Sequence, residues 1–287
     1  MGCLLKNKIK ASQIAEHLNL TMYGHDIEIN AISSLTDVKK NSLFFAKDQK
    51  ALNNVLPQAV VIAPEETAQV HLATIKSTQP RLDFIRALLF IKDKVGFVVS
   101  EVNPQIHPSV KIGQNVVIEK GVVIGEGCVI DHNVVIRQGT EIGKYCHIQS
   151  GAVIGEEGFG YERDEQNIPI KMLHLGGVKI KNNVHIGANT SVCQGALEPT
   201  IIEDNVKIDN LVHIAHNCHI KSRVIITACA EVSGGVVVEE DAWIAPQAAI
   251  RQKLIIGSAS LVGLGAVVVK NVLKNTVVMG NPAKAKE

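Results

Sequence analysis

The sequence has few aromatic residues, almost no net charge and no long apolar segment. Aromatic residues make up 3% of the 287 positions, while Ile and Val are plentiful, which favours a repetitive core of stacked β-branched residues over one built on a few large aromatic side chains. The formal net charge of +1 argues against a nucleic-acid-binding surface. No run of 18 or more apolar residues is present, and the N-terminal segment lacks the apolar region of a signal peptide. We therefore expect a cytoplasmic protein without integral membrane association.

The cysteines show no pairing pattern either. None of the six belongs to a CxxC motif, and in a reducing compartment we expect small core or coil residues rather than disulfides. They are Cys3, Cys128, Cys146, Cys193, Cys218 and Cys229.

The sequence does contain an aliphatic residue at every sixth position. A period of six fits neither a helix nor strand alternation, and it is typical of a triangular coil in which three six-residue sides form one turn. The pattern predicts a mainly β fold, a left-handed parallel β-helix over residues 101–287. The series comprises Ile106, Ile112, Ile118, Ile124, Ile130, Ile136, Ile142, Ile148, Ile154, then Ile180, Ile186, Val192, then Ile202, Ile208, Ile214, Ile220, Ile226, Val232, Val238, Ile244, Ile250, Ile256, Val262 and Val268.

The interruption at residues 155–177 predicts a loop insertion. Long loops on rigid scaffolds often line binding sites, so Phe159 and Tyr161 are candidate substrate contacts, although a plain insertion explains the segment equally well.

Residues 1–100 have a different pattern, which predicts a small α/β domain for nucleotide or sugar recognition. Helical spacing covers 11–20, and Pro80 begins a second helical segment over 80–91. Residues 26–33 and 59–64 have the composition of strands, the second buried on both faces. This domain could also serve only to cap the coil.

The densest polar cluster is KIDNLVHIAHNCH, residues 207–219. The inward register of the coil predicts that His213 and His216 lie at a corner, outside the core. A neutral imidazole there can accept a proton from an attacking amine or hydroxyl. Asn210 and Asn217 are candidates to orient that imidazole or to bind substrate.

Two other interpretations of this cluster remain. The first is a metal site, because histidines recur at every third position, at His213, His216 and His219. In a coil of period six, however, alternate histidines lie on opposite sides of an inward isoleucine and cannot easily bind one ion. They can also be solvated corner residues. Gly234 follows His216 by one 18-residue turn, so its N–H is a candidate oxyanion donor, unless the glycine only makes a tight corner.

HLGGVKIKNNVHIGANTSVCQGAL and TIIEDNVKIDNLVHIAHN closely resemble the UDP-3-O-acylglucosamine N-acyltransferases of lipid A synthesis, and the likeness extends over about residues 10–245. The resemblance implies that His216 is the general base and that the Gly234 amide forms the oxyanion hole. In that family, sites lie between neighbouring prisms of a homotrimer, so we expect a homotrimer here.

The sequence departs from that family at several positions. Lys253 stands in place of a second site histidine two turns above the base. The family's uracil-binding aromatic motif keeps Phe44 but has Lys47 and Lys50 at its other positions. The tail, with GNPAK, resembles CoA-dependent sugar acetyltransferases. This resemblance suggests cofactor contacts from Lys253 and from two basic residues near the GNPAK signature, Lys270 and Lys284.

We therefore expect an N-acyltransferase that uses acyl-CoA to acylate a nucleotide-linked amino sugar for a cell-envelope glycan or lipid. The first alternative is the lipid A enzyme with an acyl-carrier protein as donor. A hexapeptide-repeat metal enzyme of the γ-carbonic anhydrase type and a catalytically inactive scaffold are the other classes that remain open.

Overall fold

A computed structural model describes residues 3–52, 58–67 and 73–286. The chain forms two compact units, the first from residues 1–99 with 160–175 and the second from residues 100–159 with 176–287. Among the described residues, no helix has both the length and the apolar character needed to cross a membrane.

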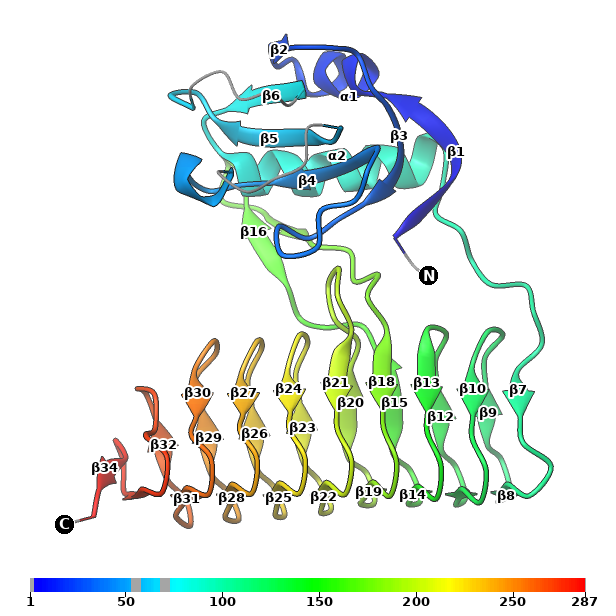
Figure 1. Ribbon diagram of the computed structural model, residues 1–287, viewed down its shortest axis with the longest axis vertical. Coiled ribbons are helices and arrows are strands. Elements are labelled where there is room, and N and C mark those ends of the chain that lie inside the picture. Colours follow the sequence, from blue (N-terminus) through cyan, green and yellow to red (C-terminus); the bar gives the residue numbers. More distant parts are fainter. Residues whose placement is uncertain (1–2, 53–57, 68–72, 287) are drawn as a thin grey trace. The chain divides into compact units, whose positions relative to one another are not determined.

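The first unit is an α/β fold, as predicted (Figure 1). Its six-stranded sheet has the order β1-β3-β4-β5-β6-β2, parallel from β3 to β6 with an antiparallel strand at each edge. Helix α2 begins with Pro80, whose fixed φ suits a first helical position, and it packs on β4 and β5. The elements are β1 (Leu4–Lys10), α1 (Ala11–Leu18), β2 (Met22–Tyr23), β3 (Glu28–Ile32), β4 (Ser42–Phe45), η1 (Gln49–Leu52), β5 (Val60–Pro64), β6 (Ala73–Ser77) and α2 (Pro80–Lys94).

The insertion is more ordered than the predicted loop. It contains an antiparallel hairpin of β16 (Tyr161–Arg163) and β17 (Pro169–Lys171), and residues 160–175 belong to the first unit. Arg86 on α2 holds Glu165 through two hydrogen bonds, of 3.0 and 2.6 Å, and Arg81 pairs with Glu162 at 3.0 Å. Bidentate contacts of this kind fix orientation as well as distance.

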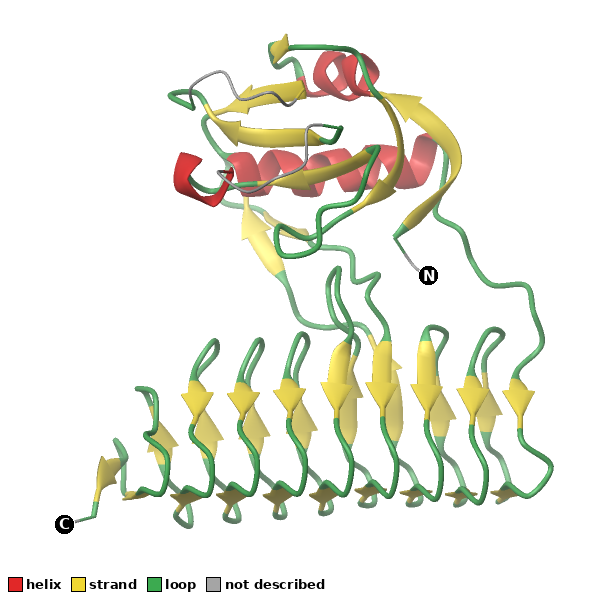
Figure 2. Ribbon diagram, viewed as in Figure 1, coloured by secondary structure: helices red, strands yellow, loops and turns green. Residues whose placement is uncertain are grey.

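The second unit is the predicted left-handed parallel β-helix, in which short strands stack turn upon turn (Figures 1 and 2). Residues 18 apart, such as Val129 and His147, are direct neighbours in the ladder. We number the three faces in chain order. The first face contains β7 (Gln105–Ile106), β10 (Val123–Ile124), β13 (Thr140–Ile142), β18 (Val178–Ile180), β21 (Thr200–Ile202), β24 (His219–Ile220), β27 (Val237–Val238) and β30 (Ile255–Ile256).

The second and third faces repeat the same arrangement. The second contains β8 (Lys111–Ile112), β11 (Val129–Ile130), β14 (His147–Ile148), β19 (His185–Ile186), β22 (Lys207–Ile208), β25 (Ile225–Ile226), β28 (Trp243–Ile244), β31 (Leu261–Val262), β33 (Val277–Met279) and the antiparallel β34 (Lys284–Ala285). The third contains β9 (Val117–Ile118), β12 (Val135–Ile136), β15 (Val153–Glu156), β20 (Ser191–Cys193), β23 (His213–Ile214), β26 (Glu231–Val232), β29 (Ala249–Ile250) and β32 (Val267–Val268).

The core of the β-helix is the six-residue aliphatic series. From Ile124 onward its members are almost fully buried and pack on one another through successive turns. Complete burial of one such side chain stabilises the fold by about 1.5–3 kcal/mol. The corners between faces need a left-handed residue, which explains recurrent asparagines with positive φ such as Asn205 (63°) and Asn217 (60°).

Strand β30 offers a direct test of this core, because Ile256 is buried and its neighbour Ile255 is 46% exposed. We expect Ile256→Ala to lower the free energy of unfolding by about 2–5 kcal/mol through lost contacts and a cavity. Ile255→Ala, the matched control, should cost less than about 1 kcal/mol. Urea titrations followed by the fluorescence of Trp243, the single tryptophan, measure both. Equal losses would contradict the inward register.

Candidate active site

One edge of the β-helix carries the irregular corners of the chain. We call it the loop-bearing edge, defined as the corners where the chain passes from the third face to the first. The insertion leaves here after β15, and a wide corner, residues 194–199, lies between β20 and β21. The next turns place the compact corners 215–218, 233–236 and 251–254 on the same edge. The candidate site is built from these successive corners.

His216 lies at the corner after β23, half-buried, with its ring against the following turn. A Cβ on Gly234 would lie 2.8 Å from His216 Cε1 and 2.9 Å from Nε2. A side chain at this corner would therefore force the imidazole to move from its present position. Among the described residues, none accepts a hydrogen bond from the Gly234 N–H, which leaves that donor beside the imidazole.

Asn217 lies next to His216 and is bound on several sides. Its Oδ1 is 3.0 Å from His216 Nδ1 and accepts a hydrogen bond from the Ala196 N–H at 3.1 Å. Its own N–H donates to Thr200 Oγ1 at 3.0 Å, and its Nδ2 donates to the Glu198 carbonyl at 3.4 Å. The wide corner thus contacts the neighbour of the candidate base.

The other polar residues of the cluster are separated from this corner. His213 lies within β23 on the third face, not at the corner as predicted, and is flanked by Ser191 and Glu231 in the ladder. Asn210 lies at a different edge, between the second and third faces, where its Oδ1 accepts a hydrogen bond from the Ala188 N–H at 2.6 Å. Neither is placed to orient His216.

The histidines proposed as metal ligands do not converge. His219 is on the first face, and its Nε2 lies 2.6 Å from Glu203 Oε1. In the part of the chain that the structure describes, no group of three His, Cys, Asp or Glu side chains is placed to hold a metal ion.

A thiol nucleophile is also disfavoured at this corner. Burial raises the pKa of Cys218 to about 12, so its thiol stays protonated near neutral pH.

The three candidate lysines lie in different parts of the second unit. Lys270 follows His216 by 54 residues, which is three 18-residue turns, and is exposed on the loop-bearing edge. At about 4.8 Å per turn the separation along the coil is about 14 Å. Lys253 aligns with Asn217 and Gly235 rather than with His216, whose own column continues to Gln252. Lys284 lies in β34 on the second face, away from this edge.

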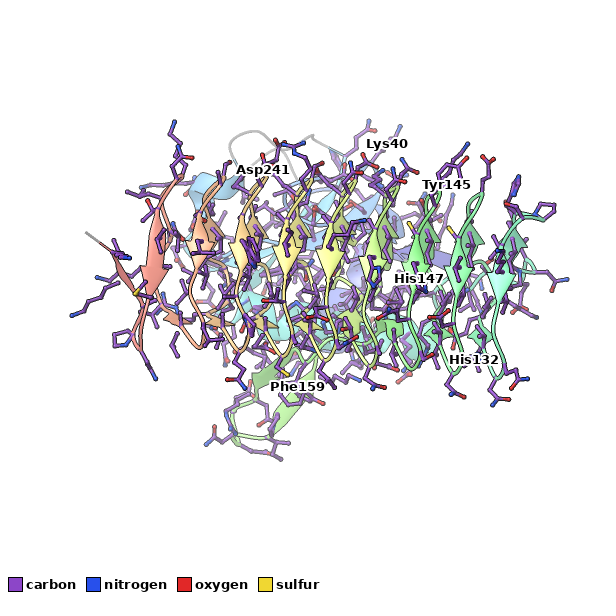
Figure 3. The ribbon with its side chains drawn as sticks, turned by 90° about the horizontal axis from the view of Figure 1, so that it is seen from below. Lys40, His132, Tyr145, His147, Phe159 and Asp241 are labelled. Carbon is purple, nitrogen blue, oxygen red and sulfur yellow. The ribbon has the colours of Figure 1, made fainter. Side chains whose placement is uncertain are left out.

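The aromatic candidates are also dispersed. Phe44 is fully buried and packs with Ala46, Leu52 and Val61 in the first unit, so the prediction that it contacts a nucleotide base is not supported by its position. Phe159 belongs to the second unit, is 87% exposed, and lies where the chain leaves the β-helix (Figure 3). Tyr161 is exposed in β16 of the first unit.

The wide corner was not predicted from the sequence. Its signal was present, because Ile202 follows Val192 by ten residues instead of six. The corner is shaped by glycines, since a Cβ on Gly195 or Gly176 would overlap the Glu198 carbonyl oxygen. Gly195 also exchanges hydrogen bonds with the stem of the insertion, donating to Gly177 and accepting from Gly176 at 3.0 and 2.9 Å.

The fold and the repeat define a class, the hexapeptide-repeat transferases. Residues 103–138, 121–156 and 199–234 match the bacterial transferase hexapeptide family (six repeats), and residues 177–214 match the hexapeptide repeat of succinyl-transferase. The β-helix resembles the UDP-N-acetylglucosamine acyltransferases of Bacteroides fragilis and Francisella novicida. Each is 25% identical, with TM-scores of 0.52 and 0.55, covering 66% and 65% of this chain and 74% and 68% of theirs.

Longer similarities identify the family within that class. The chain is 36% identical to the UDP-3-O-acylglucosamine N-acyltransferase of Campylobacter lari over 96% of its own length and 93% of the relative. It is 34% identical to the Coxiella burnetii enzyme of the same name, over 78% of this chain and 74% of the relative. The chain belongs to the UDP-3-O-acylglucosamine N-acyltransferase family.

Family membership confirms the predicted enzyme class, an N-acyltransferase. It also decides between two expectations drawn from the sequence. The lipid A alternative is better supported than the main expectation of a CoA-dependent enzyme with an unspecified amino sugar, because the similarity to the lipid A family covers nearly the whole chain.

The contact between His216 and Gly234 leads to a test by double-mutant cycle. We expect Gly234→Ala to displace the imidazole, lowering kcat at least about 100-fold and the free energy of unfolding by about 1–3 kcal/mol. In a His216→Ala background the same change should cost little stability, because no ring is left to overlap. Thermal unfolding of the four proteins measures the coupling. A loss that is the same in both backgrounds would contradict the packing described.

Proposed function

We propose that this protein transfers an acyl group from a thioester to the amino nitrogen of a UDP-linked 3-O-acylglucosamine, a step of lipid A synthesis. The observation that carries the proposal is the contact between His216 and Gly234, which brings a base and an uncommitted amide donor together at one corner. The names of the relatives support the choice of sugar nucleotide.

In the proposed reaction the neutral amine of the sugar attacks the thioester carbonyl. His216 accepts the proton lost by the nitrogen, and the Gly234 N–H stabilises the negative charge that develops on the carbonyl oxygen. The carbon–sulfur bond then breaks, the thiolate takes the proton from His216, and an amide and a free thiol are released. The balance of atoms requires no metal or redox cofactor.

For the donor we propose an acyl-carrier protein, with acyl-CoA as the second candidate. Both present the acyl group on a long thiol-ended arm with a phosphate at its base. An exposed cation about 14 Å from the base suits that phosphate, or an acidic carrier surface. Lys270 is such a cation on the loop-bearing edge. We also propose a homotrimer, since flat-faced prisms can pack side by side.

His216→Ala should lower kcat by roughly 10²- to 10⁴-fold, the usual contribution of a positioned general base. The fold should be retained, because the side chain is only half-buried. The assay measures N-acylation of UDP-3-O-acylglucosamine. Acyl-carrier protein and acyl-CoA are compared as donors, each carrying the same short or long acyl chain. His219→Ala, which alters a histidine on the first face, is the control. Turnover with acyl-CoA alone would overturn the donor assignment, and absence of N-acylation with every donor would overturn the function.

Substitutions of Lys270 and Lys284 test whether Lys270 contacts the acyl donor or whether any charge change near the tail has the same effect. We expect Lys270→Glu to raise KM for the acyl donor roughly fivefold, about 1 kcal/mol of lost charge interaction, and to leave KM for the sugar nucleotide unchanged. Lys284→Glu makes the same charge change on the second face and should leave both values near wild type. Equal effects of the two substitutions would indicate a general electrostatic effect, not a donor contact.

A further inference from the structure

We propose that Asn217 is a positioning residue that fixes the tautomer of His216, so that Nε2 is the nitrogen that accepts the proton. This inference rests on the proposed function and adds a residue to its machinery. The geometry that carries it is the triangle formed by His216 Nδ1, Asn217 Oδ1 and the Ala196 N–H, with distances of 3.0 and 3.1 Å.

The orientation of the Asn217 amide follows from its partners. A backbone N–H can only donate, so the amide atom that faces Ala196 N must be the oxygen. The same oxygen faces His216 Nδ1. An oxygen can only accept, and the hydrogen in that contact therefore belongs to Nδ1. A neutral imidazole with its hydrogen on Nδ1 carries its lone pair on Nε2.

The backbone of Asn217 is held as firmly as its side chain. Its φ is +60°, a left-handed conformation that asparagine tolerates better than most residues, and its N–H donates to Thr200 Oγ1. Its Nδ2 donates weakly to the Glu198 carbonyl, at 3.4 Å. Thr200 is fully buried, which fixes the hydroxyl that receives the bond.

The wide corner supplies both backbone partners of the side chain. Ala196 and Glu198 belong to it, and the compact corners of the following turns have no equivalent residues. Gly195 and Gly176 allow the Glu198 carbonyl to approach closely, and the stem of the insertion pairs with Gly195. The four extra residues before Ile202 thus place an N–H donor where it can hold the Asn217 oxygen against the imidazole.

The test removes the side chain without straining the backbone. Asn217→Gly keeps the positive φ, as Gly235 does one turn later with φ +71°. We expect kcat to fall about 10- to 100-fold, as it does when the hydrogen-bond partner that orients a metal-binding histidine is lost, with KM for both substrates unchanged. Asn217→Asp retains an acceptor oxygen toward Nδ1 and should recover kcat to within about fivefold of wild type. Asn205→Gly, another left-handed corner asparagine, is the matched control and should behave as wild type.

A spectroscopic measurement is independent of turnover. Nitrogen-15 spectra of labelled histidine at alkaline pH, with the His216 signal assigned by its loss in His216→Ala, report which ring nitrogen carries the hydrogen. Wild type should show the Nδ1–H form, and Asn217→Gly should shift toward the Nε2–H form that free histidine favours.

Two results would overturn the inference. One is an unchanged tautomer in Asn217→Gly, and the other is a loss expressed in KM instead of kcat. If wild type shows the Nδ1–H form but no N-acyl transfer, the proposed function fails while the positioning role of Asn217 stands.

Discussion

The structure of the second unit depends on one constraint, the stacking of one inward aliphatic side chain from every six residues. Ile214, Val232 and Ile250 occupy the same place in successive turns, and their ladder partners fix the register of everything between them. The corners that follow these residues are therefore stacked in the same register as the strands. His216 and Gly234 are in contact because the two corners are equivalent places in adjacent turns, and the pairing of the flanking strands leaves them no other arrangement.

This constraint also determines what could be predicted from the sequence. The period predicted the β-helix and placed Gly234 next to His216, because both depend only on counting. It could not predict the wide corner, whose shape depends on glycines and hydrogen bonds from the insertion. Lys253 lies two turns above His216, as the resemblance implied, but in the neighbouring column of Asn217 and Gly235, because a corner turns the chain between consecutive positions.

Two further errors have local causes. The family resemblance pointed to Phe44 in β4 as a base contact, but the structure buries Phe44 and leaves the adjacent Phe45 partly exposed, beside Phe84. The tail motif suggested a CoA enzyme, but Gly280–Lys284 makes the turn into β34 and bonds back to Val267. A segment that closes the last turn has a structural reason to be similar in proteins with different donors.

The β-helix also has a consequence for how the protein loses its structure. Each turn contacts mainly the turn before it and the turn after it, so its stability depends on its two neighbours. Local unfolding that starts at one end of the β-helix therefore proceeds turn by turn. Strand β23 has three strands beyond it on one side of its sheet and four on the other. The terminal turns can fray and reclose while the corner of His216 remains formed. Heat or denaturant should therefore unfold the terminal turns of the β-helix before it unfolds the turn that contains His216.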